Sequence, residues 1–365
     1  MSQPNDVDFD RAPFIAIWET TRACDLACVH CRALAMPEPA PGELSREEAF
    51  RLIEDIRAMG TKILVFTGGD PLKRPDLLDL IAHAKRLGLR TGAIPAVTPA
   101  LTAARLVELK SAGLDQVAFS LDSADPIEHN QFRRTPGVFE HTLEMLDEAS
   151  AVGLRTQINS LINVHNAASL DALIGLVESL GLVFWEVFFL VPTGRGKTLP
   201  LLTAQAFEAA FEKIHELSLR ARFIVKVTEA PHYRRFVIEK KGGAANGSLA
   251  LPPELRKEMG PDGAIGHAPR GVNAGKGFLF VSSTGEIYPS GFLPIEVGNV
   301  RRDALAGVYR ESRLMKQLRD PAFLKGKCGR CPYNDLCGGS RARAYALTGD
   351  PFSEDPCCVY EPQAA

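Results

Sequence analysis

Short apolar runs alternate with amphipathic helical stretches over residues 14–221, and this alternation limits the fold more than any other feature of the sequence. Each apolar run has the length of one buried strand, and each helical stretch repeats its apolar residues about every 3.6 positions. Alternation of this kind is typical of a parallel sheet with right-handed crossovers. The pattern predicts six strand–helix units, with strands at residues 14–21, 62–69, 89–96, 114–123, 154–163 and 182–192.

The predicted strands are apolar on both faces, as strands inside a parallel α/β sheet are. A doubly wound sheet and an incomplete barrel both agree with six units, which are two short of a full (β/α)₈ barrel. In either architecture, ligands bind at the carboxyl ends of the strands, so polar residues that follow a strand are candidates for a site. The helices are expected at residues 45–60, 74–88, 102–113, 138–153, 166–181 and 203–221.

The composition excludes several classes of protein. The chain of 365 residues is 45% hydrophobic and 24% charged, as a globular protein with a full core is. Its formal net charge of −2 gives no general attraction to nucleic acid or to an acidic membrane. No apolar stretch approaches the roughly 20 residues of a membrane span, and residues 1–13 are too polar for a secretory signal. We therefore expect a cytoplasmic protein without nucleic-acid or membrane partners.

The eight cysteines form two groups, at residues 24–31 and 328–358. In a reducing compartment this indicates metal binding rather than disulfides. Cys24, Cys28 and Cys31 have the spacing C-x₃-C-x₂-C and follow the first predicted strand. Three thiolates on a [4Fe–4S] cube would leave one iron open to chelate an amine and a carboxylate. A zinc knuckle completed by His30 is the alternative.

This motif, in the first loop of a βα array, resembles the signature of the radical S-adenosylmethionine (SAM) superfamily. The resemblance implies a partial (β/α)₆ barrel of the TIM type. It also implies that Cys24, Cys28 and Cys31 hold a catalytic [4Fe–4S] cluster, with His30 near the adenine of SAM. A flavodoxin- or ferredoxin-like donor would reduce the cluster, SAM would split into methionine and a 5′-deoxyadenosyl radical, and that radical would take hydrogen from a substrate.

The resemblance also implies SAM contacts at the ends of later strands. Gly68, Gly69 and Asp70 stand where the family usually has Gly-Gly-Glu-Pro, which binds the methionine amino group; a glycine-rich turn is the alternative. Ser120 and Asp122, at the end of the fourth strand, would contact the ribose or the methionine carboxylate.

Further candidates lie after the fourth, fifth and sixth strands. Arg133, or its neighbour Arg134, could pair with the methionine carboxylate through a planar fork. Asn159 and Ile162 offer adenosine a polar and an apolar face, and ordinary core residues are the alternative. Arg195 lies in the loop after the sixth strand, where a solvated basic loop is the alternative.

The second cysteine group resembles a SPASM/twitch extension. Cys328, Cys331 and Cys337 form C-x₂-C-x₅-C, and Cys358, with Cys357 as the alternative, supplies a fourth thiolate. A zinc ribbon is the alternative when this group is taken without the first motif. Ser290 and Arg341 stand where the family has ligands of a second auxiliary cluster, so the resemblance implies one auxiliary [4Fe–4S] cluster. The predicted domains are a tail at 1–12, the barrel at 13–232, a linker at 233–276, and the SPASM/twitch domain at 277–365.

The blocks "WETTRACDLACVHCRA", "LVPTGRG", "YPSGFLP" and "CGGSRARAYA" look like those of radical SAM proteins in alternative heme and heme d₁ biosynthesis. That subgroup implies a tetrapyrrole side chain as substrate, including its oxidative decarboxylation. The alternatives are a peptide substrate and a non-catalytic zinc or iron–sulfur protein. The candidate partners for substrate carboxylates are Arg195, Lys197, Arg341 and Arg343.

Overall fold

The computed structural model describes residues 8–240 and 271–363 of the chain. Within these ranges one sheet contains ten strands. Their bounds are β1 (Ile15–Glu19), β2 (Ile63–Thr67), β3 (Arg90–Ala93), β4 (Gln116–Ser120), β5 (Arg155–Ile162), β6 (Phe184–Phe189), β7 (Ile224–Thr228), β8 (Phe278–Val281), β9 (Glu286–Tyr288) and β10 (Gly298–Asn299).

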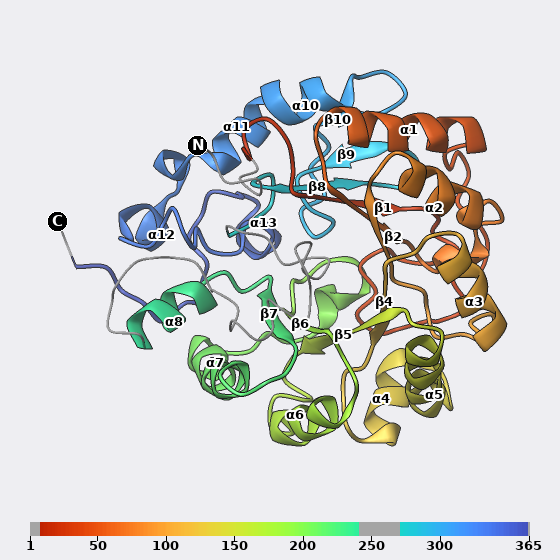
Figure 1. Cartoon of the computed structure of the whole chain (residues 1–365). Coiled ribbons are helices and arrows are strands. Elements are labelled where there is room, and N and C mark those ends of the chain that lie inside the picture. Colours follow the sequence, from red (N-terminus) through yellow and green to blue (C-terminus); the bar gives the residue numbers. More distant parts are fainter. Residues whose placement is uncertain (1–7, 241–270, 364–365) are drawn as a thin grey trace.

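The strand order is β10-β9-β8-β1-β2-β3-β4-β5-β6-β7. Neighbours from β8 through β7 pair in parallel, with Ile15 of β1 opposite both Ile63 of β2 and Phe278 of β8. The pairs β8–β9 and β9–β10 are antiparallel. The sheet curves, with β7 and β10 at its two edges and helices outside it (Figure 1). This incomplete barrel confirms the predicted α/β fold class.

The helices that connect the parallel strands cover the outer face of the sheet (Figure 1). Ser45 caps the first of them, and its side chain and that of Glu48 form a reciprocal pair of cap hydrogen bonds. The bounds are α1 (Arg46–Ala58), α2 (Leu77–Arg86), α3 (Ala103–Ser111), α4 (Pro126–Arg133), α5 (Val138–Ala151), α6 (Leu170–Ser179), α7 (Ala204–Ser218) and α8 (Tyr233–Lys240), with short 3₁₀ helices η1 (Pro71–Lys73) and η2 (Gly194–Thr198).

All six predicted strands are present, and the structure adds a seventh parallel strand, β7, together with helix α4. Both elements are short, and β7 carries Lys226 in its middle, so its apolar run is interrupted. A strand that places a charged side chain on its inner face gives a weak apolar signal.

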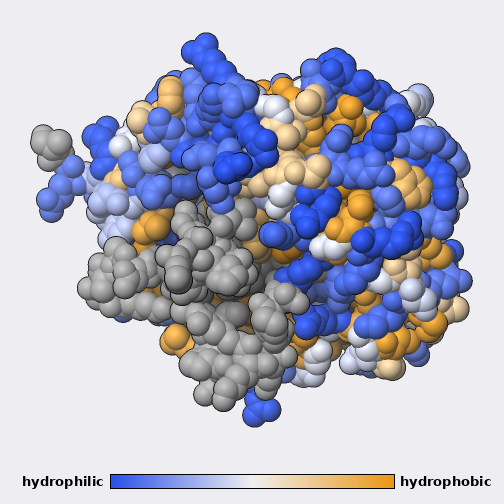
Figure 2. Space-filling view, turned by 45° about the horizontal axis from the view of Figure 1, so that its top comes forward, coloured by the Kyte–Doolittle hydropathy of each residue, from blue (hydrophilic) through white to orange (hydrophobic). Residues whose placement is uncertain are grey.

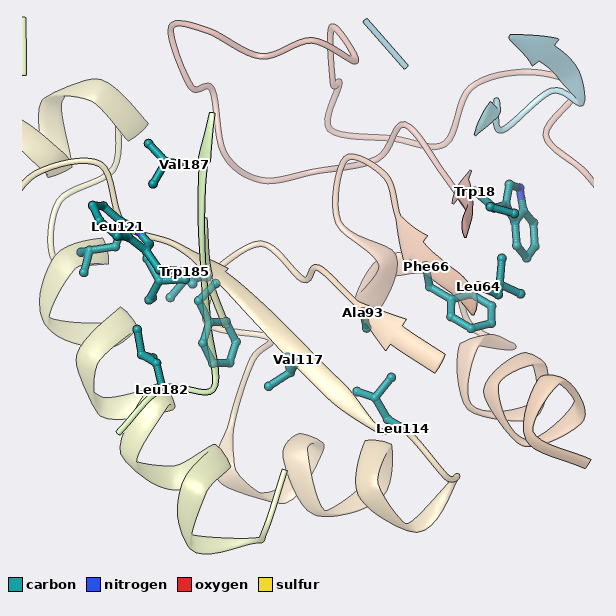
Figure 3. Packing of buried hydrophobic residues seen from close by; sticks show 14 of the residues in the cluster. Trp18, Leu64, Phe66, Ala93, Leu114, Val117, Leu121, Leu182, Trp185 and Val187 are labelled. Atoms are coloured by element: carbon teal, nitrogen blue, oxygen red, sulfur yellow. The ribbon is translucent and has the colours of Figure 1, made fainter. Parts of the chain in front are cut away.

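Side chains alternate between the two faces of each strand, and the two faces pack differently. On the outer face, Trp18 of β1 and Phe66 of β2 pack with their ring centroids 6.1 Å apart. Figure 3 shows these two rings beside Leu64, with Trp185 further along the same layer. On the inner face, Ile15 forms a smaller apolar cluster that belongs to the inside of the barrel.

The C-terminal part begins with a hairpin, whose strands β8 and β9 join around Gly285. The hairpin extends the barrel sheet beside β1, which the sequence did not predict. The elements that follow are α10 (Leu305–Glu311), α11 (Arg313–Arg319), η3 (Pro321–Phe323), α12 (Gly326–Arg330) and α13 (Arg341–Thr348).

Most of the predicted linker, residues 241–270, lies outside the described residues, whereas its first part forms α8. Figure 2 shows one face of the molecule that is mainly hydrophilic, with hydrophobic residues scattered over it. Among the described helices, none combines the length and the apolar character that crossing a membrane requires.

Candidate functional site

The loop that carries Cys24, Cys28 and Cys31 follows β1 and rests directly on backbone from two other loops. A Cβ added at Gly69 would lie 2.4 Å from the carbonyl oxygen of Ala23. A Cβ added at Gly194, whose φ is +56°, would lie 2.3 Å from the carbonyl oxygen of Cys31. Glycine is therefore required at both positions. At Gly69, the close approach expected between the Gly68–Gly69 turn and a ligand is an approach to the cysteine loop itself.

The three thiols lie in an apolar pocket that supplies hydrogen-bond donors to sulfur. The backbone N–H groups of Leu26 and Ala35 point at the Sγ atoms of Cys24 and Cys31, at 3.3 and 3.4 Å. Arg133 lies 3.9 Å from the Sγ of Cys28. Burial raises the pKa of Cys24 to about 12 and also raises that of Cys28. Such buried thiols remain protonated until a metal replaces the proton, and N–H donors then stabilise the thiolate.

His30 lies beside this pocket, stacked on Phe132 with ring centroids 4.4 Å apart. Burial lowers the pKa of His30 to about 3, so the ring is neutral. Its Nδ1 atom has no hydrogen-bond partner among the described residues. A neutral imidazole in a stack can offer both a flat face and a free ring nitrogen to a ligand.

Arg133 and Asp122, two of the predicted SAM contacts, form an ion pair with each other. The Nε and Nη2 atoms of Arg133 lie 2.8 and 2.6 Å from Oδ2 of Asp122. Burial alone would raise the pKa of Asp122, but the charge of Arg133 holds it below its ordinary value. Asp122 also accepts a hydrogen bond from the backbone of Leu161, 2.9 Å away. The pair thus links the ends of β4 and β5 to Cys28.

Asp70 is fully buried, and the protein itself uses both of its carboxylate oxygens. One oxygen accepts hydrogen bonds from the backbone N–H groups of Leu72 and Ala96, and the other accepts from the hydroxyl of Thr98. Burial raises the pKa of Asp70 to about 6. Asp70 therefore caps η1 and holds the loop after β3. The backbone of the Gly68–Gly69 turn, rather than this carboxylate, is the part of the motif that lies against the cysteine loop.

The remaining predicted SAM contacts at strand ends do not all lie on the same face of the sheet. Ser120 is partly exposed at the end of β4. Asn159 lies on the inner side of β5, where its side chain accepts a hydrogen bond of 2.6 Å from Gln157. Ile162 lies on the opposite side of β5 in the core beneath the helices, with no exposed surface. The structure therefore contradicts the expectation that Ile162 offers an apolar face to adenosine, because strand alternation turns it away.

Arg195 lies against the cysteine loop and does not extend into solvent. Its Nε donates a hydrogen bond of 2.8 Å to the carbonyl of Cys28, and Nη1 donates one of 3.2 Å to that of Ala35. The third guanidinium nitrogen, Nη2, is buried without a partner among the described residues. Arg195 thus binds two carbonyls of the loop and keeps one donor free.

The inside of the barrel contains a lumen of about 990 Å³ of empty space, including its open mouth. One side of the lumen is apolar, and the side formed by β4–β7 and the residues after β7 carries the polar groups. The apolar wall includes Ile15, Ile17, Val65, Ile94, Phe278 and Phe292. The polar wall includes Gln116, Gln157, Glu186, Lys226, Thr228, Glu229 and Arg234, with Ala118, Phe188, Val227 and Pro231 among them.

A second hollow, with about 370 Å³ of empty space, lies in the C-terminal part. Cys328, Cys331, Cys337 and Cys358 all line it, whereas Cys357 does not. The Sγ of Cys357 faces the carbonyl of Leu202, 4.0 Å away. All eight cysteines are free thiols. In the described part of the chain, no three His, Cys, Asp or Glu side chains converge where one ion could sit.

Two arginines that we expected to bind substrate carboxylates are instead part of the framework around this hollow. Arg341 is fully buried and donates hydrogen bonds of 2.8 Å to the carbonyls of Pro351 and Ser353. Arg343 forms a fully buried ion pair with Asp355, 3.1 Å away. Neither arginine lines the lumen.

The sequence reasoning missed three residues of interest, Gly194, Glu229 and Arg234. Glu229 and Arg234 both follow β7, the strand that was not predicted, and a strand assigned to "FIVKVT" would have marked them as strand-end candidates. Gly194 gives no signal in the sequence beyond its place in a glycine-containing loop.

Comparison with known proteins places this geometry in a family. Residues 18–178 match the Radical SAM superfamily. An AdoMet-dependent heme synthase of Oleidesulfovibrio alaskensis is 37% identical over 348 residues, which cover 95% of this chain and 87% of that protein. A pre-heme d1 synthase of Dinoroseobacter shibae is 28% identical over 362 residues, covering 94% of this chain and 85% of that protein.

Among solved structures, SuiB of Streptococcus suis bound to precursor peptide SuiA has a TM-score of 0.72 at 17% identity. The likeness covers 96% of this chain and 76% of SuiB, so the shared fold includes the C-terminal part. The same protein has also been solved with S-adenosylmethionine. The sequence relatives, the shared fold and the three-cysteine loop at the end of β1 agree: the chain belongs to the radical SAM superfamily and is an iron–sulfur-dependent radical SAM enzyme.

Proposed function

We propose that the substrate is a tetrapyrrole and that the enzyme takes hydrogen from one of its carboxylate-bearing side chains. The observation that carries this proposal is the lumen, which has an apolar wall and a polar wall that includes charged side chains. A macrocycle with acidic side chains has the same division between an apolar face and anionic groups. The names of the heme synthase and pre-heme d1 synthase relatives support the same class of substrate.

In this proposal the residues of the barrel have distinct tasks. Cys24, Cys28 and Cys31 hold the catalytic [4Fe–4S] cluster, which together with SAM supplies the 5′-deoxyadenosyl radical when both are bound. The Gly68–Gly69 turn presents its backbone to the methionine end of SAM, and His30 offers its ring face to the adenine. Asp70 supports this turn as the cap of η1. The remaining predicted SAM contacts lie at or after the carboxyl ends of the barrel strands and are Ser120, Asp122, Arg133, Asn159 and Arg195.

Cys328, Cys331, Cys337 and Cys358 are proposed to hold one auxiliary [4Fe–4S] cluster. Support comes from the hollow that these four thiols share and from the orientation of Cys357 away from it. The free thiols and the reducing chemistry of the family fit a cytoplasmic protein that receives electrons from a flavodoxin- or ferredoxin-like donor.

The proposed reaction is an oxidative decarboxylation that converts a carboxylate-bearing side chain into a vinyl group. Loss of one hydrogen atom from the side chain leaves a carbon radical next to the CH₂ that bears the carboxylate. Cleavage of the bond to the carboxylate then gives a vinyl group and carbon dioxide and releases one electron. An auxiliary cluster held by Cys328, Cys331, Cys337 and Cys358 would supply the acceptor for this electron.

Anaerobic turnover tests the proposal. With reductant and SAM, an iron porphyrin that carries propionate side chains should increase the formation of 5′-deoxyadenosine. Mass spectrometry should show a loss of carbon dioxide and two hydrogen atoms for each side chain converted. If porphyrins have no effect while a peptide increases 5′-deoxyadenosine formation and changes in mass, the enzyme modifies peptides, as the peptide-bound structural neighbour would suggest.

A further inference from the structure

The polar wall of the lumen contains two oppositely charged side chains, Lys226 and Glu186, that pair with each other. Lys226 of β7 lies 2.8 Å from Oε1 of Glu186 on β6, and the hydroxyl of Thr228 donates a hydrogen bond of 2.6 Å to the same oxygen. The amide of Gln157 donates to the other oxygen at 3.1 Å. The Glu186 carboxylate is thus fully engaged, and the charge of Lys226 is neutralised within the wall.

Glu229, just beyond the end of β7, is engaged by the C-terminal part of the molecule. Its carboxyl accepts a hydrogen bond of 2.7 Å from the hydroxyl of Ser340, and burial raises its pKa. Its φ is +58°, an uncommon conformation for a residue with a side chain, and Arg343 donates a hydrogen bond to its backbone carbonyl. Glu229 is therefore held in place and does not pair with Arg234.

Arg234 is the exception on this wall. Its Nη1 and Nη2 atoms donate hydrogen bonds of 2.9 and 2.8 Å to the carbonyls of Leu336 and Val272. No carboxylate of the described residues pairs with it, and its side chain is only partly exposed. Gly271 provides the space for this group, because a Cβ there would lie 2.7 Å from its central carbon. A partly buried cation without an anion is unfavourable, and anion binding offsets that cost.

We propose that Arg234 binds a carboxylate of the substrate at the wall of the lumen. The inference rests on the proposed function, and it replaces Arg341 and Arg343 with a residue that lines the lumen. The two carbonyl acceptors fix the plane of the guanidinium, so a fork of N–H donors is oriented before the substrate arrives. The macrocycle would then lie against the apolar wall, and its bound side chain would differ from the reacting one.

Arg234 also lies near Cys337, which gives a competing role in tuning the auxiliary cluster. The test must separate the two roles. The protein is the reconstituted enzyme, and the probes are an iron porphyrin with free propionate side chains and the same porphyrin as its methyl ester. Binding is measured by anaerobic absorbance titration without reductant.

Wild type should bind the acid about ten- to a hundredfold more tightly than the ester, as expected for a charge-assisted hydrogen bond. Arg234→Gln should reduce the affinity for the acid to nearly that for the ester and leave ester binding unchanged. Arg234→Lys should recover part of the preference, because it restores a point charge without the fork. Arg220→Gln is the matched control, since it removes a surface charge that pairs with Glu178 outside the lumen, and it should change neither affinity.

Three other outcomes would contradict the role of Arg234 or the proposed function. If Arg234→Gln keeps the preference for the acid, the inference is overturned while the tetrapyrrole proposal stands. If Arg234→Gln keeps the preference and changes the iron content or the electron paramagnetic resonance signal of the auxiliary cluster, the competing role is correct. If wild type binds neither porphyrin, the proposed function is overturned together with the inference that rests on it.

Discussion

The two cysteine sites have the same kinds of support but a different number of thiols. Each rests on backbone at a glycine: an added Cβ would lie 2.4 Å from the carbonyl oxygen of Ala23 at Gly69, and 2.3 Å from that of Leu324 at Gly329. Each also has a buried ion pair nearby, Arg133–Asp122 beside Cys28 and Arg343–Asp355 in the C-terminal part. The first site has three thiols in one loop, and the second has four thiols around a hollow.

This difference matches the tasks proposed for the two sites. A site that binds SAM needs an open coordination position and backbone groups that approach a ligand closely. A site that only passes an electron needs all its ligands from the protein and charges that tune its potential. The predictions below test whether the two sites are independent and whether each depends on its own support.

The largest expected effect comes from removing the three-thiol site. Changing Cys24, Cys28 and Cys31 together to Ala should abolish reductive SAM cleavage and leave about four of about eight irons. Iron and sulfide analysis and the yield of 5′-deoxyadenosine measure both effects. Formation of 5′-deoxyadenosine by this variant would show that catalysis occurs elsewhere, and a wild-type content near twelve irons would contradict a single auxiliary cluster.

A smaller effect should distinguish the two adjacent cysteines of the second site. Cys358→Ser should lose the auxiliary cluster, about half of the iron, because Cys358 lines the hollow. Cys357→Ser is the matched control and should keep the full iron content, since the Sγ of Cys357 faces Leu202. The reverse pattern would assign the fourth ligand to Cys357.

The backbone support of the first site predicts a sharp cost for one methyl group. Gly69→Ala would place a Cβ 2.4 Å from the carbonyl of Ala23, so the cysteine loop must shift, at a cost of roughly 3 kcal/mol or more. The variant should lose the catalytic cluster selectively and keep the auxiliary one. Gly175→Ala in α6 is the control, because no atom lies within 4 Å of the added Cβ, and it should retain both clusters. Equal loss of both clusters in Gly69→Ala would mean that the sites are not independent.

The smallest effect concerns Asp70. Its pKa in the folded protein is about 6, against an ordinary value of 3.8, so the folded state binds the proton more tightly than the unfolded chain. The stability that this proton contributes is complete below about pH 4 and is lost as the pH rises through about 6. The loss amounts to about 1–3 kcal/mol and should be absent in Asp70→Asn.

The measurement is the free energy of unfolding of both proteins across this pH range, compared as a difference so that other groups cancel. SAM affinity should change less than tenfold in Asp70→Asn, because the protein occupies both oxygens. A hundredfold loss of SAM affinity would instead show that Asp70 contacts SAM directly, as its place in the motif suggested.

The sequence predicted elements well where a local signal exists. The six apolar runs became strands, and a helix follows each of them, because periodicity acts within one strand or a few helical turns. Strand β7 was missed because Lys226 interrupts its apolar run, and with it the residues that follow the strand, Glu229 and Arg234, were overlooked. The predicted orientation of the Ile162 side chain was also wrong, because neighbouring residues of a strand point to opposite faces of the sheet.

By itself, the sequence determined the βα order, the class of fold and the identity and spacing of the three thiols that characterise the family. Only the tertiary structure decided which residues surround the substrate space and which support the framework. Arg341 and Arg343 became buried supports, whereas Arg234 faces the lumen. The spacing of residues shows which groups are close along one segment. The partners of a buried charge come from segments distant in the chain, and they determine whether the charge stabilises the fold or remains free to bind a ligand.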